Sequence, residues 1–185
     1  NDADRYFESY ANAITALSAE STHDEVEKNP GISVKLSALH PRYEFAKKDD
    51  VIKSLVGRVK SLALQAKASN VGFTIDAEEA RVLDLSLDIF EAVYRDPMLD
   101  GWTGFGLALQ SYQKRAHRVI DWLVDLQKQV GRRIMLRLIK GAYWDAEIKY
   151  AQEQGSSGYP VFTRKASTDV SFLACAKKIL SHPTA

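Results

Sequence analysis

The fold of this chain is indicated most clearly by one stretch, Arg137-Leu-Ile-Lys-Gly-Ala-Tyr-Trp-Asp145. The apolar run 134–139 predicts a buried strand, although it contains Arg137 and is followed by Lys140. Buried strands rarely carry cationic side chains unless an anionic group pairs with them or a catalytic role requires them. A strand that ends in a glycine-containing turn before a helix is also where α/β proteins bind ligands. The stretch therefore predicts a functional site at the carboxyl end of a strand.

Strand-like and helical segments alternate along the rest of the chain. Strands are expected at 32–38, 72–76 and 104–110, and helices at 3–20, 49–68, 78–94, 114–130, 145–154 and 168–180. This alternation implies a parallel sheet with right-handed crossovers. The prediction is an α/β fold, the first half of a (β/α)8 TIM-like barrel, with a leading helix and loop (1–30) and about four βα units (31–185). A doubly wound sheet is the alternative, but no Gly-x-Gly-x-x-Gly fingerprint follows the first strand.

The composition is that of an ordinary soluble globular protein. The 185 residues are 45% hydrophobic and 26% charged, which is enough for one domain with a core. Lys+Arg 25 against Asp+Glu 24 argues against a dedicated nucleic-acid binder, and no apolar run has the length of a membrane span. The single cysteine, Cys175, suits a reducing compartment and is expected in the core. The four histidines are scattered, so no metal-ligand spacing is found.

Polar side chains lie in or at the ends of all four predicted strands: Lys35, Asp76, Gln110, Arg137 and Lys140. Parallel strands present their carboxyl ends on one face, which holds the active site in barrel enzymes. Each residue alone has a structural explanation, such as Asp76 capping the next helix or pairing with Lys35. The set as a whole predicts a site on this face.

Two chemistries are open for Lys35. Held in its charged form by Asp76, it is a fixed cation for an anionic substrate; desolvated, it could act as a Schiff-base nucleophile. The nearby carboxylate favours the charged form. Arg137 suits hydrogen bonding to an electron-rich ring or carbonyl. Tyr143 and Trp144 could pack against a flat ring of a ligand or simply cover the top of the barrel.

Five motifs resemble the proline dehydrogenase domain of the bifunctional proline-utilisation flavoenzymes, which fuse this domain to a pyrroline-5-carboxylate dehydrogenase. The similarity runs in order from Gly31 to Leu180. The motifs are Val34-Lys-Leu-Ser-Ala-Leu-His-Pro-Arg-Tyr43, Ile75-Asp-Ala-Glu-Glu79, Gln110-Ser-Tyr-Gln-Lys-Arg115, the opening stretch 137–145, and Tyr159-Pro-Val-Phe-Thr-Arg-Lys165.

The resemblance implies a distorted (β/α)8 barrel that binds FAD and oxidises L-proline to pyrroline-5-carboxylate, with quinone as the acceptor of the flavin's electrons. In the catalytic set it implies that Lys35 contacts the substrate carboxylate, Asp76 lies at the substrate pocket and Tyr143 packs on the proline ring. It implies that Gln110 and Arg137 hydrogen-bond the flavin ring. The residues that it places along the rest of the FAD are Ile139, Lys140, Gly141, Ala142, Trp144, Thr163 and Lys165.

The family's paired-arginine motif and its His-containing strand do not occur before Ala185. We therefore expect this chain, which starts at Asn1 rather than Met, to be a piece of a longer molecule that does not turn over proline alone. The resemblance implies that the longer protein adds the rest of the barrel and an aldehyde dehydrogenase domain. It also implies a cytoplasmic enzyme that associates peripherally with the membrane when reduced. No nucleic-acid binding is expected through this segment.

Two other functions stay open on the residues alone. One is a barrel enzyme that uses Lys35 or Lys140 as a Schiff base. The other is a non-catalytic half-barrel module in which the polar residues at the strand ends are structural.

Overall fold

A parallel four-stranded sheet in the order β1-β2-β3-β4 organises the computed structural model, which describes residues 2–182. The strands are β1 (Gly31–Val34), β2 (Gly72–Ile75), β3 (Phe105–Gln110) and β4 (Met135–Ile139). The α-helices are α1 (Asp2–Ser18), α2 (Leu36–Leu39), α3 (Lys48–Ala68), α4 (Leu83–Tyr94), α5 (Ala116–Val130), α6 (Trp144–Glu153) and α7 (Lys165–Leu180). Short 3-10 helices are η1 (Val26–Lys28), η2 (Phe45–Lys47), η3 (Ala80–Val82) and η4 (Pro97–Leu99).

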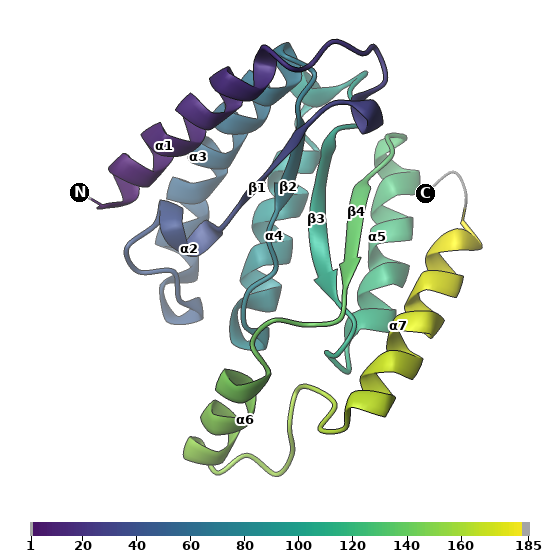
Figure 1. Ribbon diagram of the computed structural model, residues 1–185. Coiled ribbons are helices and arrows are strands. Elements are labelled where there is room, and N and C mark those ends of the chain that lie inside the picture. The colour runs from purple at the N-terminus through teal and green to yellow at the C-terminus, as the bar shows by residue number, and fades with distance from the viewer. Residues whose placement is uncertain (1, 183–185) are drawn as a thin grey trace.

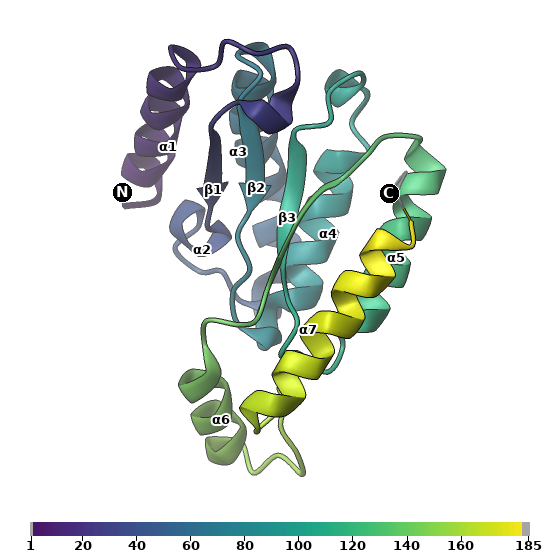
Figure 2. The same ribbon diagram turned by 45° about the vertical axis from the view of Figure 1, so that its right-hand side comes forward.

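The helices α3, α4 and α5, which link successive strands, lie together on one face of the sheet (Figures 1 and 2). Each strand pairs in parallel with the next one along the chain. The α/β fold therefore has the architecture of the first half of a (β/α)8 TIM-like barrel preceded by a helix, and the fold prediction is confirmed.

The sheet has one apolar face and one face with small or polar residues. Phe73, Phe105 and Leu107 are buried against the helices, and the Phe105 ring stacks on Phe90 of α4 with centroids 5.2 Å apart. Burial of each such side chain contributes about 1.5–3 kcal/mol. On the opposite face, Gly106 and Ala108 of β3 present almost no side chain, and the Met135 side chain of β4 reaches across to Gly72 of β2.

The first strand ends earlier than the alternating pattern predicted. β1 stops at Val34, and residues 36–39 form one helical turn, so the prediction of a strand to residue 38 was wrong. Leu36 and Leu39 are both fully buried, and their spacing of three residues matches a helical turn rather than a strand. Lys35 consequently lies just beyond β1, as the N-cap residue of α2.

Two other predictions need correction. The helix expected from residue 78 begins as η3, and α4 starts only at Leu83. The fourth strand, predicted to be buried, is only partly covered, and Arg137 within it is exposed. The reason is that β4 lies at an edge of the sheet and pairs on one side alone. Cys175 is fully buried in the core, as predicted.

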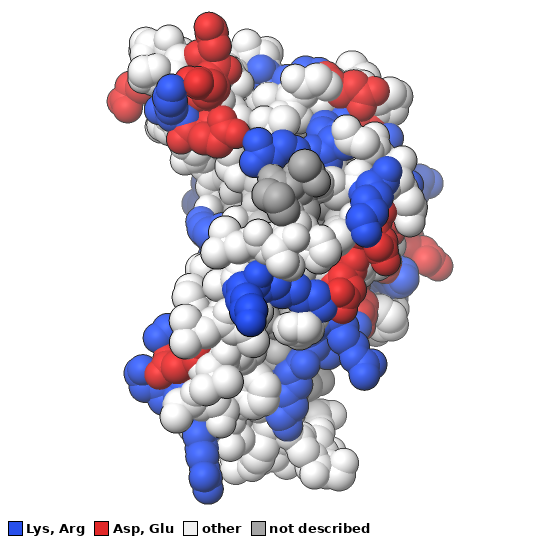
Figure 3. Space-filling model, turned by 90° about the vertical axis from the view of Figure 1, so that its right-hand side faces the viewer, with Lys and Arg blue, Asp and Glu red and all other residues white. Residues whose placement is uncertain are grey.

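The outer surface of α7 is unusually apolar. Val170, Leu173 and Leu180 are 68%, 68% and 78% exposed. On the face that carries α7, large uncharged areas separate the basic side chains (Figure 3). Apolar surface on this scale is typically covered by a partner.

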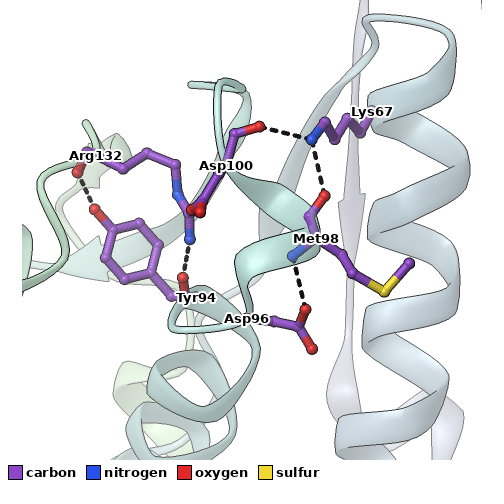
Figure 4. A network of polar contacts seen from close by, with 6 residues as sticks. All are labelled: Lys67, Tyr94, Asp96, Met98, Asp100 and Arg132. Carbon is purple, nitrogen blue, oxygen red and sulfur yellow. Dashed lines mark hydrogen bonds and ion pairs between the residues drawn. The ribbon is translucent and has the colours of Figure 1, made fainter.

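A polar cluster around Arg132 joins the elements at the end of the sheet where the strands begin (Figure 4). The Arg132 guanidinium donates to the carbonyl of Tyr94, pairs with Asp100 at 2.6 Å and lies 4.7 Å from the Tyr94 ring centroid. The Tyr94 hydroxyl donates to the Arg132 carbonyl, and Lys67 donates to the carbonyls of Met98 and Asp100. In barrels this face serves stability rather than catalysis.

We expect Arg132→Met to lower the free energy of unfolding by about 2 kcal/mol, because the buried Tyr94 carbonyl loses its donor. Arg95→Met is the matched control and should cost less than about 1 kcal/mol, because the Arg95 side chain is 43% exposed and its ion pair with Glu91 lies at the surface. Urea denaturation followed by circular dichroism measures both. Equal losses for the two variants would contradict this account of the cluster.

Candidate functional site

The carboxyl ends of the four strands bring Arg137 and Asp76 together, as the strand order predicted. Arg137 of β4 reaches over the small residues of β3 to contact both other strands. Its two terminal nitrogens lie 2.5 Å from the Ser33 hydroxyl of β1 and 2.5 Å from the Asp76 carboxylate beyond β2. This charge-assisted contact fixes the guanidinium across the open face of the sheet.

Lys35 forms a second bridge between the two edge strands. Its ammonium donates to the Tyr143 hydroxyl at 3.0 Å and lies 5.6 Å from the centroid of that ring. This hydrogen bond, with smaller contributions from Asp76 and Glu78, raises the pKa of Lys35. The lysine is therefore held in its charged form, which disfavours a Schiff-base role. The carboxylate of Asp76 pairs with Arg137 rather than with Lys35 in the part of the chain that the structure describes.

Gln110 lies at the end of β3 with a side chain that is only 1% exposed. Its amide nitrogen donates to the Glu78 carbonyl at 2.8 Å, and its amide oxygen accepts from the Ala142 backbone at 2.9 Å. Gln110 therefore joins the loop after β2 to the loop after β4. These two bonds leave the amide one N–H donor and one oxygen lone pair with which it could contact a ligand.

Glu78 belongs to the same hydrogen-bonded chain, although it was not predicted as a site residue. Its carboxylate accepts from the Ser37 backbone at 3.0 Å, so Glu78 links α2, the loop after β2 and the end of β3. It lies in a quoted motif, next to Asp76, but nothing in the residue pattern distinguishes it from Glu79.

A hollow of about 350 Å³ opens beside these loops, within the range of about 300–1,000 Å³ typical of ligand sites. Gly141 forms part of its wall with a φ of 154°, and a Cβ there would overlap the Tyr112 ring. Glycine is thus required for the close approach of this turn to Tyr112. The other residues around the hollow are Lys140, Trp144, Phe162, Thr163, Lys165 and Thr168.

A cluster of two cations and one anion borders the hollow. Lys140 and Lys165 contact the two carboxylate oxygens of Asp169 at 2.5 and 2.8 Å, and both lysines lower the pKa of Asp169. Two positive charges against one negative charge leave the cluster net positive. It suits an anionic group such as a phosphate.

The remaining predicted residues surround the same corner. Trp144 is 43% exposed, and its ring nitrogen donates to the Phe162 carbonyl at 3.0 Å. Ile139 is partly buried and accepts from the Ser111 backbone through its carbonyl, whereas Ala142 and Thr163 are exposed. The structure therefore separates the predicted set into a pair of bridges across the sheet and a group around the hollow.

Sequence reasoning missed Tyr112 and Phe162 as site residues. The Tyr112 hydroxyl accepts from the Tyr143 backbone at 3.3 Å, and the Tyr112 carbonyl accepts from the Phe162 backbone at 2.8 Å. Both lie inside motifs quoted above, so their position in those motifs was the available signal.

Within residues 2–182, no group of three or more potential ligand side chains could hold a metal ion. No helix in that range is both long and apolar enough to cross a membrane.

A family profile described as "Proline dehydrogenase" matches residues 1–185. "Bifunctional protein PutA" of Salmonella typhimurium is 54% identical over 182 residues, which are 98% of this chain and 14% of that protein. A crystal structure of mutant Proline Utilization A (PutA) from Bradyrhizobium japonicum aligns with a TM-score of 0.97 and 53% identity over 99% of this chain and 19% of that one. PutA from Bdellovibrio bacteriovorus, inactivated by N-propargylglycine, aligns with a TM-score of 0.89 and 28% identity over 97% and 20%.

Proposed function

Because the chain belongs to the proline dehydrogenase family, we propose that it forms part of an FAD-dependent enzyme that oxidises L-proline to pyrroline-5-carboxylate. The observation that carries this proposal is the pair of bridges Lys35–Tyr143 and Arg137–Asp76, which places fixed cations at the carboxyl ends of the strands. Barrel enzymes hold their active sites on this face.

The chain spans only 14% of the length of the curated relatives it matches. We propose that residues 1–185 are the N-terminal part of the proline dehydrogenase domain of a longer bifunctional protein, here called the parent enzyme. The unpaired edge at β4 and the exposed apolar side chains of α7 support this, since further barrel elements would cover them. The parent enzyme would add the rest of the barrel and an aldehyde dehydrogenase domain.

Lys35 is the proposed partner of the proline carboxylate. Its raised pKa keeps it cationic at neutral pH, and its hydrogen bond to Tyr143 holds the ammonium at one point. A fixed cation orients a carboxylate with little loss of side-chain entropy on binding. The Tyr143 ring, beside Lys35, would pack on the apolar part of the proline ring. Asp76 would shape the substrate pocket indirectly, because its carboxylate holds the Arg137 guanidinium in place.

The described residues also fit an FAD. The hollow of about 350 Å³ offers the exposed Trp144 ring to a flat group and the net positive Lys140–Lys165 cluster to a phosphate. Gly141 and Thr163 line this space, and Ile139 and Ala142 are proposed as further contacts of the FAD from the family relationship. Arg137 and Gln110 would hydrogen-bond the ring system. When bound, FAD would accept the hydride from the proline carbon next to nitrogen.

Quinone is the proposed acceptor of the electrons in the parent enzyme. A cytoplasmic location with peripheral membrane association in the reduced state is proposed with it. Both rest on the family relationship and not on a feature of residues 2–182.

Visible absorption of the protein with FAD, before and after anaerobic proline, tests the proposed function. The parent enzyme should show an oxidised flavin band that bleaches with proline. The 185-residue chain should not turn over proline at a measurable steady rate. A parent enzyme that retains flavin but ignores L-proline would overturn the proposal, and borohydride trapping of a carbonyl substrate on Lys35 or Lys140 would favour Schiff-base chemistry instead.

A further inference from the structure

The helix α6 stands away from the body of the molecule in both ribbon views (Figures 1 and 2). Of its ten residues only Glu147 and Ala151 are buried. A helix with so little apolar contact is held by specific polar contacts rather than by hydrophobic packing. Since Tyr143 and Trp144 stand at its N-terminal end, whatever fixes α6 also fixes two residues of the proposed site.

Glu147 is the one buried charged side chain of α6, and it is only 3% exposed. Its carboxylate accepts a hydrogen bond from the Ala80 backbone at 2.6 Å, across 67 positions of sequence. Burial raises the pKa of Glu147, and the Ala80 N–H partly offsets this effect. A carboxylate is buried at such a cost only where it makes a good hydrogen bond.

The partner of Glu147 lies in the loop that carries Asp76. Ala80 is the first residue of η3, and Glu79 before it makes no side-chain cap for that turn. Glu147 therefore supplies the missing cap from another element. This bond, together with the Arg81 guanidinium 5.7 Å from the Tyr150 ring centroid, ties the β2 loop with Asp76 to the helix that begins after Tyr143.

We propose that Glu147 is a positioning residue of the site, which sets the placement of Tyr143 against Lys35 by anchoring α6 to the backbone of Ala80. The Glu147 backbone N–H donates to the Tyr143 carbonyl at 2.9 Å. The contacts given for the Glu147 carboxylate include neither Lys35 nor Tyr143, so the effect of this side chain is indirect. The inference deepens the proposed function and rests on it for any effect on proline.

Two measurements on the 185-residue chain test the anchor without substrate. In Glu147→Ala, the Ala80 amide should exchange its hydrogen about tenfold faster, because one hydrogen bond of about 1.4 kcal/mol is lost. Lys35 should be acylated faster in competitive labelling, since it loses the Tyr143 contact that raises its pKa. Glu147→Gln keeps an acceptor oxygen and should give intermediate values for both.

The matched control is Glu153→Ala on the same helix. Glu153 is 57% exposed and pairs only weakly with Lys149, at 3.8 Å. This variant should leave Ala80 exchange and Lys35 labelling at wild-type values. A general loss of structure in Glu147→Ala would change circular dichroism, and the Glu147→Gln variant then decides the question.

In the parent enzyme, Glu147→Ala should lower kcat/KM for proline about tenfold, mostly through KM, and Glu147→Gln should restore part of it. If Glu147→Ala shows the same Ala80 exchange and the same Lys35 labelling as Glu153→Ala, the positioning role is overturned. This holds even if the wild-type parent enzyme oxidises proline. If Ala80 exchange and Lys35 labelling are faster in Glu147→Ala but the flavin of the parent enzyme does not react with proline, the anchoring role of Glu147 is supported. The proposed function is then overturned instead. The two failures are thus distinguishable.

Discussion

Lys35→Met is expected to raise the KM for L-proline of the parent enzyme about 100-fold, with a smaller effect on kcat. Methionine keeps much of the length and apolar stem of lysine but removes the cation. A substrate carboxylate that loses one charge-assisted hydrogen bond loses about 2.7 kcal/mol of binding, which corresponds to this factor. Steady-state kinetics with proline and an artificial electron acceptor measures it.

Two further variants separate the charge of Lys35 from its placement. Tyr143→Phe removes the hydroxyl that holds the ammonium but keeps the ring, so KM should rise by less than in Lys35→Met. Lys149→Met removes a cation that is 78% exposed on α6 and should leave KM unchanged. A KM for Lys35→Met within about threefold of wild type would show that the carboxylate binds elsewhere.

Gly106→Ala is expected to destabilise the fold by at least about 3 kcal/mol. A Cβ at Gly106 would overlap the backbone carbonyl of Met135 on the neighbouring strand. Because the obstacle is backbone within a paired sheet, it cannot rotate away as a side chain would. Urea denaturation of the 185-residue chain and its soluble yield measure the loss.

Gly57→Ala is the matched control for this substitution. Gly57 lies inside α3, and a Cβ there meets nothing within 4 Å. Alanine in a helix interior is more stable than glycine by about 0.5–1 kcal/mol, so this variant should unfold at higher urea. A Gly106→Ala protein that unfolds within about 1 kcal/mol of wild type would contradict the close approach of β3 and β4.

The order of strands and helices could be predicted from the amino-acid sequence, and so could the face on which Asp76, Gln110 and Arg137 lie. These follow from local patterns, since apolar periodicity and glycine turns act over a few residues. The end of β1 was misjudged because Leu36 fits both an alternating pattern with Val34 and Ala38 and a helical turn with Leu39. β4 is partly exposed because it lies at an edge of the sheet, and the pattern of apolar residues along a strand does not show whether the strand lies at an edge.

The partners of these side chains, in contrast, become apparent only in the three-dimensional structure. On the sequence, Asp76 could cap the next helix or pair with Lys35, whereas the structure pairs it with Arg137 and gives Lys35 to Tyr143. Glu147 looked like any acidic residue of an amphipathic helix until its contact with Ala80 was seen. The physical reason is that each of these contacts joins residues 60 or more positions apart. Such pairings depend on strand order, small residues such as Gly106 and the packing of loops, which no local pattern specifies.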